Sequence, residues 1–261
     1  MKNLLILSEV IDSMRMRTAC TADYENLKNL WREAFEEEES FLHAFFYERI
    51  KPENILILED SDEKLISMLY MLPCILETDK ERLSAVNVVG VATSNAHRNK
   101  GYMRKLINYS FEIMTERKVD AAFLKPSNKA FYEQFGFKES NSLYTSVYSE
   151  FSSEYRVFIN SVGEELNFLI GELEKIYNLA HSAGTRVLRS AEDWKFNLFE
   201  KCVALSSHSY LICEMKDSSF VCQESMPVIR GDRTGCSMVK PISKQGEQIC
   251  FNEENFIFEQ Y

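Results

Sequence analysis

The sequence predicts a mixed α/β protein built in two parts, and three observations support this. Apolar residues at helical spacing alternate along the chain with short β-branched segments. Only 9 Gly and 5 Pro occur among 261 residues, which excludes collagen-like and low-complexity chain. The pattern runs to about residue 150 and then starts again more weakly. We therefore expect one domain over residues 1–150 and a smaller one over residues 151–261.

Periodicity in the first part predicts strands that alternate with amphipathic helices. Thr21 stands where it could cap the first helix, and the polar residues 59–62 are typical of a hairpin turn. The expected strands are residues 15–19, 54–58, 65–76, 85–93, 121–124 and 143–148. The expected helices are residues 21–35, 41–47, 101–118 and 127–134.

Gly90 lies in the middle of the strand from Ala85 to Thr93, which is rich in β-branched residues and should be well buried. A glycine inside such a strand indicates either a β-bulge or a place where a ligand approaches the backbone closely.

The second part shows helical spacing twice and then a series of short strand patterns. The helices are expected at residues 164–180 and 191–199. The strands are expected at residues 209–214, 219–223, 237–239 and 256–258. The tripeptide from Arg230 to Asp232 is interpreted as a turn.

The composition limits the classes of partner and the compartment. The net charge is −10, which disfavours nucleic acid and anionic membrane as partners and favours a cationic one. No apolar run is long enough for a membrane span. The 7 cysteines are odd in number and scattered, and His181 and His208 have no neighbour at metal-ligand spacing. We expect reduced thiols, no metal and a cytoplasmic location.

A basic segment interrupts this acidic background. No carboxylate side chain occurs between Glu81 and Glu112, and Arg98, Lys100 and Arg104 fall inside that interval. Gly101 opens the helix that follows the buried strand. Backbone N–H groups at a helix start and the helix dipole both attract anions, and glycine allows close approach. The sequence therefore predicts a pyrophosphate-binding loop.

Two motifs resemble those of the GCN5-related N-acetyltransferase (GNAT) family. Arg98-Asn99-Lys100-Gly101-Tyr102-Met103 resembles the family's acetyl-CoA-binding pattern Gln/Arg-x-x-Gly-x-Gly/Ala, from which Met103 departs. The segment from Tyr132 to Phe137 resembles the family's Tyr-x-x-x-Gly-Phe segment. The resemblance implies a GNAT fold and acetyl-CoA as co-substrate. It implies these cofactor-binding residues: Val91, Ala92, Thr93, Arg98, Asn99, Lys100, Gly101, Tyr102, Met103 and, at an offset from the usual position, Asn128.

Within that family the chain resembles the enhanced-intracellular-survival type. The resemblance rests on the helix with Trp31, Ala34 and Phe35, on the acidic stretch that follows it, and on a second region without the cofactor motif. It implies that residues 151–261 are a shortened, degenerate GNAT-like domain. Relatives of this type often assemble, so a homo-oligomer is one expectation.

The resemblance also implies direct acetyl transfer. Backbone N–H groups near Val91 and Thr93 would polarise the thioester, and Tyr132 would protonate the leaving thiolate. The alternative for Tyr132 is a core residue of its aromatic neighbourhood. The candidates for the general base are His97, the C-terminal carboxylate of Tyr261 and the acidic stretch, which would also attract a cationic acceptor. That stretch consists of Glu36, Glu37, Glu38 and Glu39.

We expect an N-acetyltransferase that acts on a primary amine of a small cationic molecule or a protein. The main alternative is a non-catalytic CoA-binding or interaction protein whose acceptor site is degenerate. A nucleotide-phosphate-binding protein is a third alternative, although no Lys-Ser/Thr pair follows Gly101 as a P-loop requires.

Overall fold

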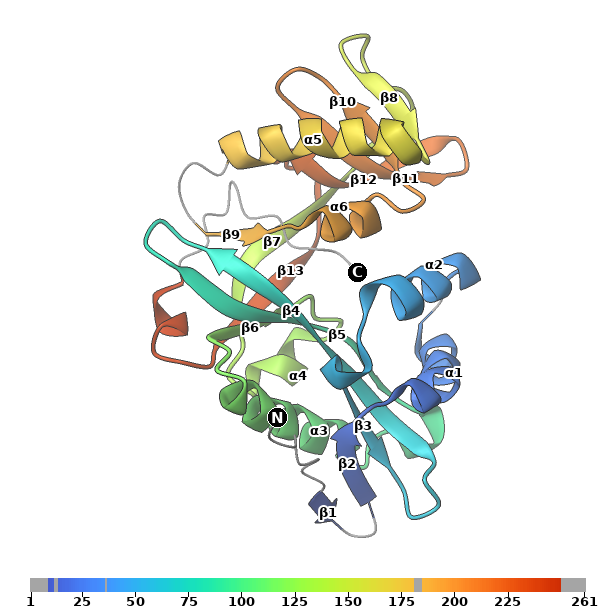
Figure 1. Cartoon of the computed structure of the whole chain (residues 1–261), viewed down its shortest axis with the longest axis vertical. Coiled ribbons are helices and arrows are strands. Elements are labelled where there is room, and N and C mark those ends of the chain that lie inside the picture. The colour runs from blue at the N-terminus through green and yellow to red at the C-terminus, as the bar shows by residue number, and fades with distance from the viewer. Residues whose placement is uncertain (1–8, 12–13, 36, 181–184, 250–261) are drawn as a thin grey trace. The chain divides into compact units, whose positions relative to one another are not determined.

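The computed structural model describes residues 9–11, 14–35, 37–180 and 185–249, which pack as two compact units. Unit 1 comprises Met1–Pro73, Ser84–Leu124 and Pro241–Lys244. Unit 2 comprises Cys74–Leu83, Lys125–Lys240 and Gln245–Tyr261. Helices and strands alternate in both units (Figure 1), which confirms the predicted mixed α/β class. The expected boundary near residue 150 stays a prediction.

Unit 1 is built on strands in the order β1-β2-β3-β4-β5-β6. The pairs β1·β2, β2·β3 and β3·β4 are antiparallel, whereas β5 and β6 are parallel, so the sheet is mixed. Strands β4 and β5 are long, and their linked ends, Cys74–Leu83, belong to unit 2. The strands are β1 (Glu9–Ile11), β2 (Met14–Thr18), β3 (Ile55–Glu59), β4 (Leu65–Glu77), β5 (Arg82–Thr93) and β6 (Ala121–Leu124).

Helices cover both faces of this sheet, with α1 and α2 on the side opposite α3 (Figure 1). The α-helices are α1 (Tyr24–Ala34), α2 (Glu39–Ala44) and α3 (Tyr102–Glu116). Single turns occur as 3₁₀-helix at Thr21–Asp23, Pro52–Asn54 and Asn95–His97 and as π-helix at Phe45–Arg49. The predicted helix over residues 41–47 is therefore two elements, because the backbone changes to π-helical bonding at Phe45.

Aromatic side chains fill the space between α1, α2 and the sheet. Trp31 packs edge-on against Tyr70 with ring centroids 5.3 Å apart, and Phe45 and Phe46 both contact the same pair of rings. All four side chains are buried. Such rings contribute large apolar areas and preferred edge-to-face geometry, so they fix α1 firmly against β4.

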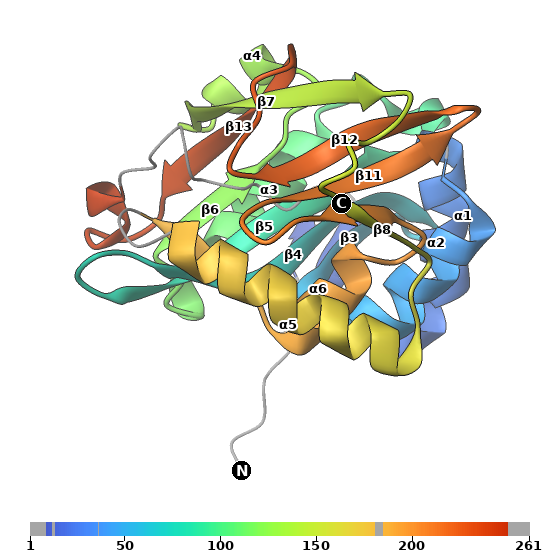
Figure 2. The same ribbon diagram turned by 90° about the horizontal axis from the view of Figure 1, so that it is seen from above.

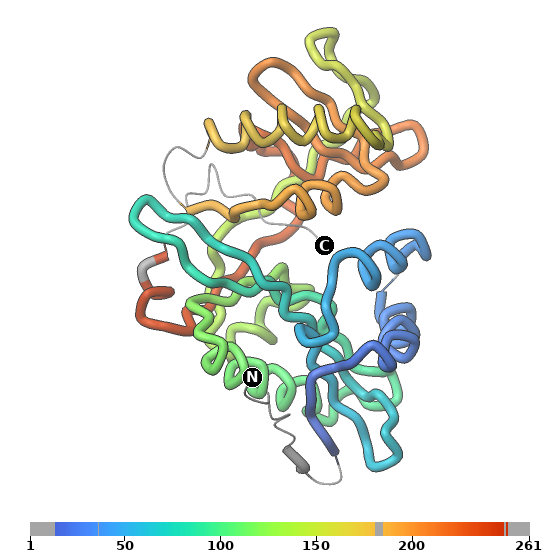
Figure 3. Tube along the Cα trace, in the orientation of Figure 1, coloured from blue at the N-terminus to red at the C-terminus, as the bar shows by residue number. Residues whose placement is uncertain are grey.

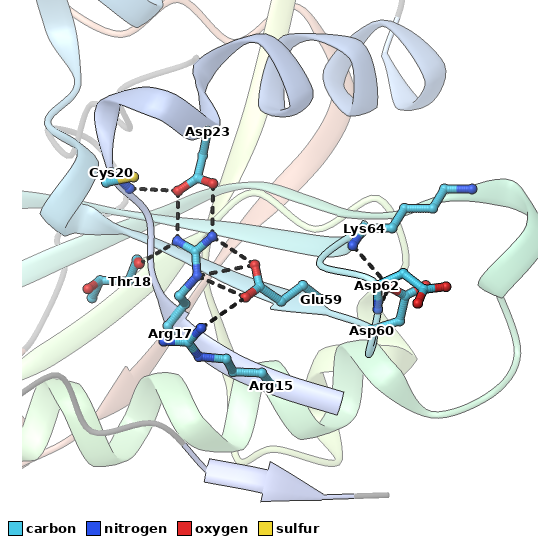
Figure 4. A network of polar contacts seen from close by, with 9 residues as sticks. All are labelled: Arg15, Arg17, Thr18, Cys20, Asp23, Glu59, Asp60, Asp62 and Lys64. Atoms are coloured by element: carbon cyan, nitrogen blue, oxygen red, sulfur yellow. Dashed lines mark hydrogen bonds and ion pairs between the residues drawn. The ribbon is translucent and has the colours of Figure 1, made fainter. Parts of the chain in front are cut away.

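The start of α1 is held by a network of charged groups (Figure 4). The Arg17 guanidinium donates to both oxygens of Asp23 at 2.7 and 2.9 Å and to the buried Glu59 at 2.7 Å. The hydrogen bond to Asp23 is the main cause that raises the pKa of Arg17. Asp23 also accepts the Cys20 backbone N–H at 2.7 Å. The prediction that Thr21 is the cap is wrong, because Asp23 supplies the capping carboxylate.

Unit 2 has an antiparallel sheet in the order β13-β7-β12-β11-β10-β8, and β9 pairs with the Ile75–Glu77 end of β4. Figure 3 follows this part of the chain from strand to strand. The strands are β7 (Lys138–Tyr148), β8 (Arg156–Ile159), β9 (Arg186–Leu188), β10 (Cys202–Leu205), β11 (Tyr210–Lys216), β12 (Ser219–Met226) and β13 (Asp232–Pro241). The helices are α4 (Lys129–Glu133), α5 (Gly163–Ala180), α6 (Ala191–Asn197) and a 3₁₀ turn at Gly246–Gln248.

One face of this sheet packs against α5 and α6 (Figure 2), and the core there includes Leu173, Trp194 and Tyr210. A buried ion pair lies in this layer. Arg189 donates to both oxygens of Glu224 at 2.7 and 2.8 Å, and Tyr210 donates to the same carboxylate at 2.7 Å. The Glu224 carboxylate thus accepts hydrogen bonds from both Arg189 and Tyr210, and such bonds offset the cost of burying its charge.

The structure differs from the sequence-based expectation in several elements of unit 2. Strands β8, β9 and β10 were not predicted, because each is short and β10 is a fully buried run without alternation. Asp232 begins β13, so the tripeptide interpreted as a turn is partly strand. The cysteines scattered in sequence come together here, since Cys202 faces Cys213 and Cys213 faces Cys222 across the sheet. The strand predicted at residues 256–258 lies outside the described residues.

Candidate active site

Gly90 marks an irregularity in β5, as its position in the sequence suggested. Its φ is +58°, in the left-handed region that glycine adopts readily. A Cβ placed on Gly90 would lie 2.5 Å from Trp31 Cζ3 and 2.5 Å from Tyr70 Cδ2. The indole and phenol rings therefore pack directly on the backbone of β5. This packing fixes the path of the strand immediately before Val91, Ala92 and Thr93.

The segment that leaves β5 is tied to its surroundings by polar contacts. Thr93 Oγ1 is 2.8 Å from Ser67 Oγ on β4, and the Thr93 carbonyl accepts a hydrogen bond from Arg98 Nε at 3.2 Å. Ser94 Oγ is 2.7 Å from His97 Nδ1. These contacts shape the loop before α3, and they occupy one nitrogen of His97, a candidate general base.

Glu33 joins this loop from α1. Its carboxylate accepts the Asn95 backbone N–H at 2.5 Å, although the two residues are 62 positions apart in sequence. The segment between Glu81 and Glu112 contains no carboxylate side chain, but in the folded protein the Glu33 carboxylate contacts it. Nothing in the spacing of α1 distinguishes Glu33 from other exposed helix positions, so sequence reasoning could not identify this contact.

The N-terminus of α3 has the features of an anion site. Gly101 is the N-cap residue with φ +79° and ψ 5°, and no side chain caps the helix. Its first backbone N–H groups consequently lack the side-chain acceptor that a Ser, Thr, Asp or Asn cap would provide. Arg98, Asn99, Lys100 and Gly101 are exposed, so cationic groups and N–H donors share one accessible loop. This arrangement fits a phosphate group.

The next two cofactor candidates continue the same helix. Tyr102 and Met103 occupy the first two positions of α3 and are half-buried. The Tyr102 ring lies 6.4 Å from the His97 ring between centroids. Met103, the departure from the family pattern, is the second residue of α3.

Strands β5 and β6 stop pairing six residues before β5 ends at Thr93. They pair in parallel from Ala85 opposite Ala121 to Asn87 opposite Phe123, after which β6 ends and β5 continues to Thr93. Asn87 therefore lies at the fork. The residue is 1% exposed, and within the described part of the chain neither Nδ2 nor Oδ1 has a hydrogen-bond partner.

The acidic stretch leads from α1 into α2, of which Glu39 is the first residue. Glu37, Glu38 and Glu39 are exposed, whereas Glu36 lies outside the described residues. Glu39 is engaged by Arg32, whose Nε and Nη2 donate to its two oxygens at 2.6 and 2.9 Å. The hydrogen bond from Arg32 is the main cause that lowers the pKa of Glu39. The charge of Glu39 is thus already matched by a cation of this chain.

Tyr132 and Asn128 belong to unit 2. Tyr132 is buried in α4 between the rings of Phe131 and Phe137, with centroids at 5.1 and 6.0 Å. Burial raises the pKa of Tyr132 to about 12. Asn128 caps α4, where its Oδ1 accepts the Phe131 N–H at 3.3 Å. Tyr261, the other predicted catalytic residue, lies outside the described residues.

The described residues contain no group of three or more His, Cys, Asp or Glu side chains placed to hold a metal ion. Within the same ranges, none of the helices combines the length and the apolar character that crossing a bilayer demands.

Comparison with known proteins agrees with this geometry. Residues 15–140 match the family model described as an acetyltransferase (GNAT) domain. This segment contains the Gly90 irregularity, the loop before α3, and Tyr132. No curated protein sequence matches the chain significantly.

Solved structures share the fold at low sequence identity. A conserved protein of unknown function from Enterococcus faecalis V583, a probable N-acyltransferase, is 13% identical with a TM-score of 0.67, over 92% of this chain and 74% of that one. A GCN5-related N-acetyltransferase from Kribbella flavida is 10% identical with a TM-score of 0.62, over 88% and 72%. Eis1 from Mycobacterium abscessus is 16% identical with a TM-score of 0.57, over 78% of this chain and 54% of its own. These likenesses confirm the GNAT fold.

Proposed function

We propose that the chain is an acetyl-CoA-dependent N-acetyltransferase that acts on a primary amine of a small cationic molecule or a protein. One observation carries the proposal. In a GNAT domain, the exposed and uncapped N-terminus of α3 follows the irregular strand β5 and is preceded by Arg98 and Lys100. Phosphate groups of acetyl-CoA fit this combination of N–H donors, helix dipole and cations.

The proposed reaction is a direct transfer. The uncharged amine nitrogen attacks the thioester carbonyl carbon, the carbon–sulfur bond breaks, and the amine loses a proton to a base. Tyr132 donates its phenolic proton to the departing sulfur. Its pKa of about 12, raised by burial, keeps that proton on the oxygen throughout the neutral range. Backbone N–H groups of Val91 and Thr93 would stabilise the developing negative charge on the carbonyl oxygen.

The general base belongs to the proposal as an open choice among named groups. His97 retains its second ring nitrogen after the contact with Ser94. Glu37 and Glu38 are exposed near α2. We also retain the chain-terminal carboxylate of Tyr261, a degenerate GNAT-like domain over residues 151–261, a cytoplasmic location and a homo-oligomer as parts of the proposal.

A second candidate function is a CoA-binding protein without turnover. The pairing of Glu39 with Arg32 favours it, because a carboxylate already neutralised within the chain attracts a cationic acceptor less strongly. The two functions differ in one measurable property, the release of free thiol from acetyl-CoA in the presence of an amine.

The test begins with binding. Isothermal titration should show that acetyl-CoA and CoA bind. Replacing both Arg98 and Lys100 by Ala should weaken binding by roughly 10- to 100-fold, because a hydrogen bond to a charged group contributes about 1.5–3 kcal/mol. Lys51→Ala, which removes an exposed charge elsewhere in unit 1, should leave the dissociation constant unchanged.

Thiol release is then measured across a panel of polyamines, aminoglycosides and lysine-containing peptides. Amine-dependent release that Tyr132→Phe abolishes would support the enzyme. Tight binding of acetyl-CoA with no release for any amine would support the binding protein. Absence of binding to acetyl-CoA and CoA would refute both.

A further inference from the structure

Asn87 is a buried amide without a hydrogen-bond partner among the described residues. The residue is 1% exposed, and both Nδ2 and Oδ1 lack a hydrogen bond, although each is buried. Buried polar groups are almost always hydrogen-bonded, and an unpaired one costs about 1–3 kcal/mol. Strand β5 of unit 1 therefore carries an unfavourable group, and this cost indicates a compensating role.

The position of Asn87 indicates what that role is. It is the last residue of β5 that pairs with β6, opposite Phe123, so it lies where the two parallel strands part. It is three residues before the irregularity at Gly90. The indole Nε1 of Trp31, whose ring packs on Gly90, is also buried without an acceptor. Unsatisfied polar groups thus occur on β5 itself and on α1, whose Trp31 packs on β5.

The two free atoms of the carboxamide define the chemistry of a complementary group. Nδ2 donates hydrogen bonds and Oδ1 accepts them. A group that presents one carbonyl oxygen and one N–H satisfies both atoms at once, as a secondary amide does. In the proposed reaction such groups come from two sources. One is the amides of the pantetheine arm of acetyl-CoA, and the other is the thioester carbonyl together with the attacking amine.

We propose that the Asn87 side chain is a substrate-binding group, which hydrogen-bonds a carbonyl oxygen and an N–H of the bound reactants at the fork between β5 and β6. This inference rests on the proposed acetyl transfer. Hydrogen bonds to the bound substrate would offset the free-energy cost of burying this amide without partners in the unliganded protein. A side chain that serves binding at the expense of stability can be recognised by its apolar replacement, which raises the stability of the protein and weakens the binding of the ligand.

Asn87→Leu is the variant that tests this signature, because leucine has the same branching and the same number of side-chain heavy atoms. The thermal midpoint of Asn87→Leu without ligand should equal or exceed that of the natural protein. Its CoA affinity, or its kcat/KM for the amine, should fall by about tenfold or more. Asn87→Ala repeats the ligand measurements if leucine does not fit. Ser110→Ala, which removes a buried hydroxyl that is bonded within α3, is the control and should change neither ligand measurement.

The arms of the experiment distinguish the two sources and the two ways to fail. Weaker binding of CoA, which has no acetyl group, assigns Asn87 to the pantetheine amides. Unchanged CoA affinity with a reduced kcat/KM for the amine assigns it to the reacting groups. If Asn87→Leu and Asn87→Ala match the natural protein in both measurements, the inference is wrong while the proposed function stands. A lower thermal midpoint with unchanged binding and turnover would mean a structural role only. If the natural protein binds no CoA, the proposed function fails and this inference fails with it.

Discussion

Gly90→Ala probes the contact that shapes β5, and the structure allows its cost to be worked out. Two effects add. A non-glycine residue at φ +58° costs about 1–2 kcal/mol in backbone strain. The new methyl group would also lie 2.5 Å from both Trp31 Cζ3 and Tyr70 Cδ2, closer than carbon atoms approach, and these rings are buried among other aromatic side chains. Overpacking of this kind costs typically 1–3 kcal/mol. We expect a total loss of about 2–5 kcal/mol.

Gly101→Ala is the matched control, because it separates strain from packing. Gly101 has φ +79°, so the same backbone strain applies, but among the described residues no atom beyond its chain neighbours and its own helix backbone lies within 4 Å of the position of its Cβ. The loss should therefore be only about 1–2 kcal/mol. Acetyl-CoA affinity should nevertheless fall by at least about tenfold, because a methyl group would stand at the exposed helix start where we place the phosphates.

Urea unfolding at equilibrium measures both losses, followed by circular dichroism and by tryptophan fluorescence. Trp31 in unit 1 and Trp194 in unit 2 are the 2 tryptophans of the chain, so separate transitions of the units would be visible. The free energy of unfolding should fall more in Gly90→Ala than in Gly101→Ala. Equal losses would show that Trp31 and Tyr70 yield without cost. A larger loss in Gly101→Ala would refute the reasoning from packing.

Three further predictions concern unit 2. Burial raises the pKa of Tyr132 from 10 to about 12, so the phenol does not change the stability below pH 10. As pH rises from 10 to 12, the free energy of unfolding should fall by about 2–3 kcal/mol, because only the unfolded state releases the proton. Tyr132→Phe should remove this part of the loss, measured as the difference between the two proteins in urea unfolding. Arg189→Met should lower the free energy of unfolding by about 3–5 kcal/mol, because it leaves the Glu224 carboxylate buried without its cation. The double variant Arg189→Met with Glu224→Leu should lose less than the single variant. Equal losses would contradict the pairing. Ser190→Ala should lose about 1 kcal/mol, since Ser190 Oγ accepts the Asp193 N–H in a capping box at the start of α6; a thermal midpoint equal to that of the natural protein would exclude the cap.

Much of unit 1 could be predicted because local pattern and tertiary role agree there. Residues 85–88 of β5 are buried in succession, so both faces of the strand are covered there, and the spacing of Leu106, Ile107 and Met114 matches the buried face of α3. For Gly90 the sequence predicts a bulge or the close approach of a ligand, and the structure shows instead that the protein's own Trp31 and Tyr70 rings pack on its backbone. Gly101 was predicted at the helix start and is found there.

What could not be predicted depends on contacts between residues distant in sequence. The hydrogen bond from Asn95 to Glu33 joins two elements 62 residues apart, and neither residue has an unusual local pattern. Strand β10 has too few residues to show a period, and only its position between β8 and β11 makes it a strand. The lack of a partner for Asn87 is likewise a property of its surroundings, because the sequence contains many asparagines and no signal that one of them is isolated in a core.

The charge of the site follows from these distant contacts as well. From sequence alone, the loop at Arg98 and Lys100 is cationic in an acidic protein, because no carboxylate stands between Glu81 and Glu112. In the structure, the Glu33 carboxylate holds the Asn95 N–H at the start of the same loop, while Glu39 is matched by Arg32. Acidic groups of the α1–α2 region thus serve partly to position the loop and to balance a cation of the chain itself. If the acceptor is cationic, as we propose, its attraction must come from the carboxylates outside these contacts. Charge reversal at Glu38, which makes neither of these contacts, should raise the KM for a polyamine and leave acetyl-CoA affinity unchanged, whereas reversal at Glu33 should disturb the cofactor loop. Equal effects of the two variants on acetyl-CoA affinity would contradict this division of roles.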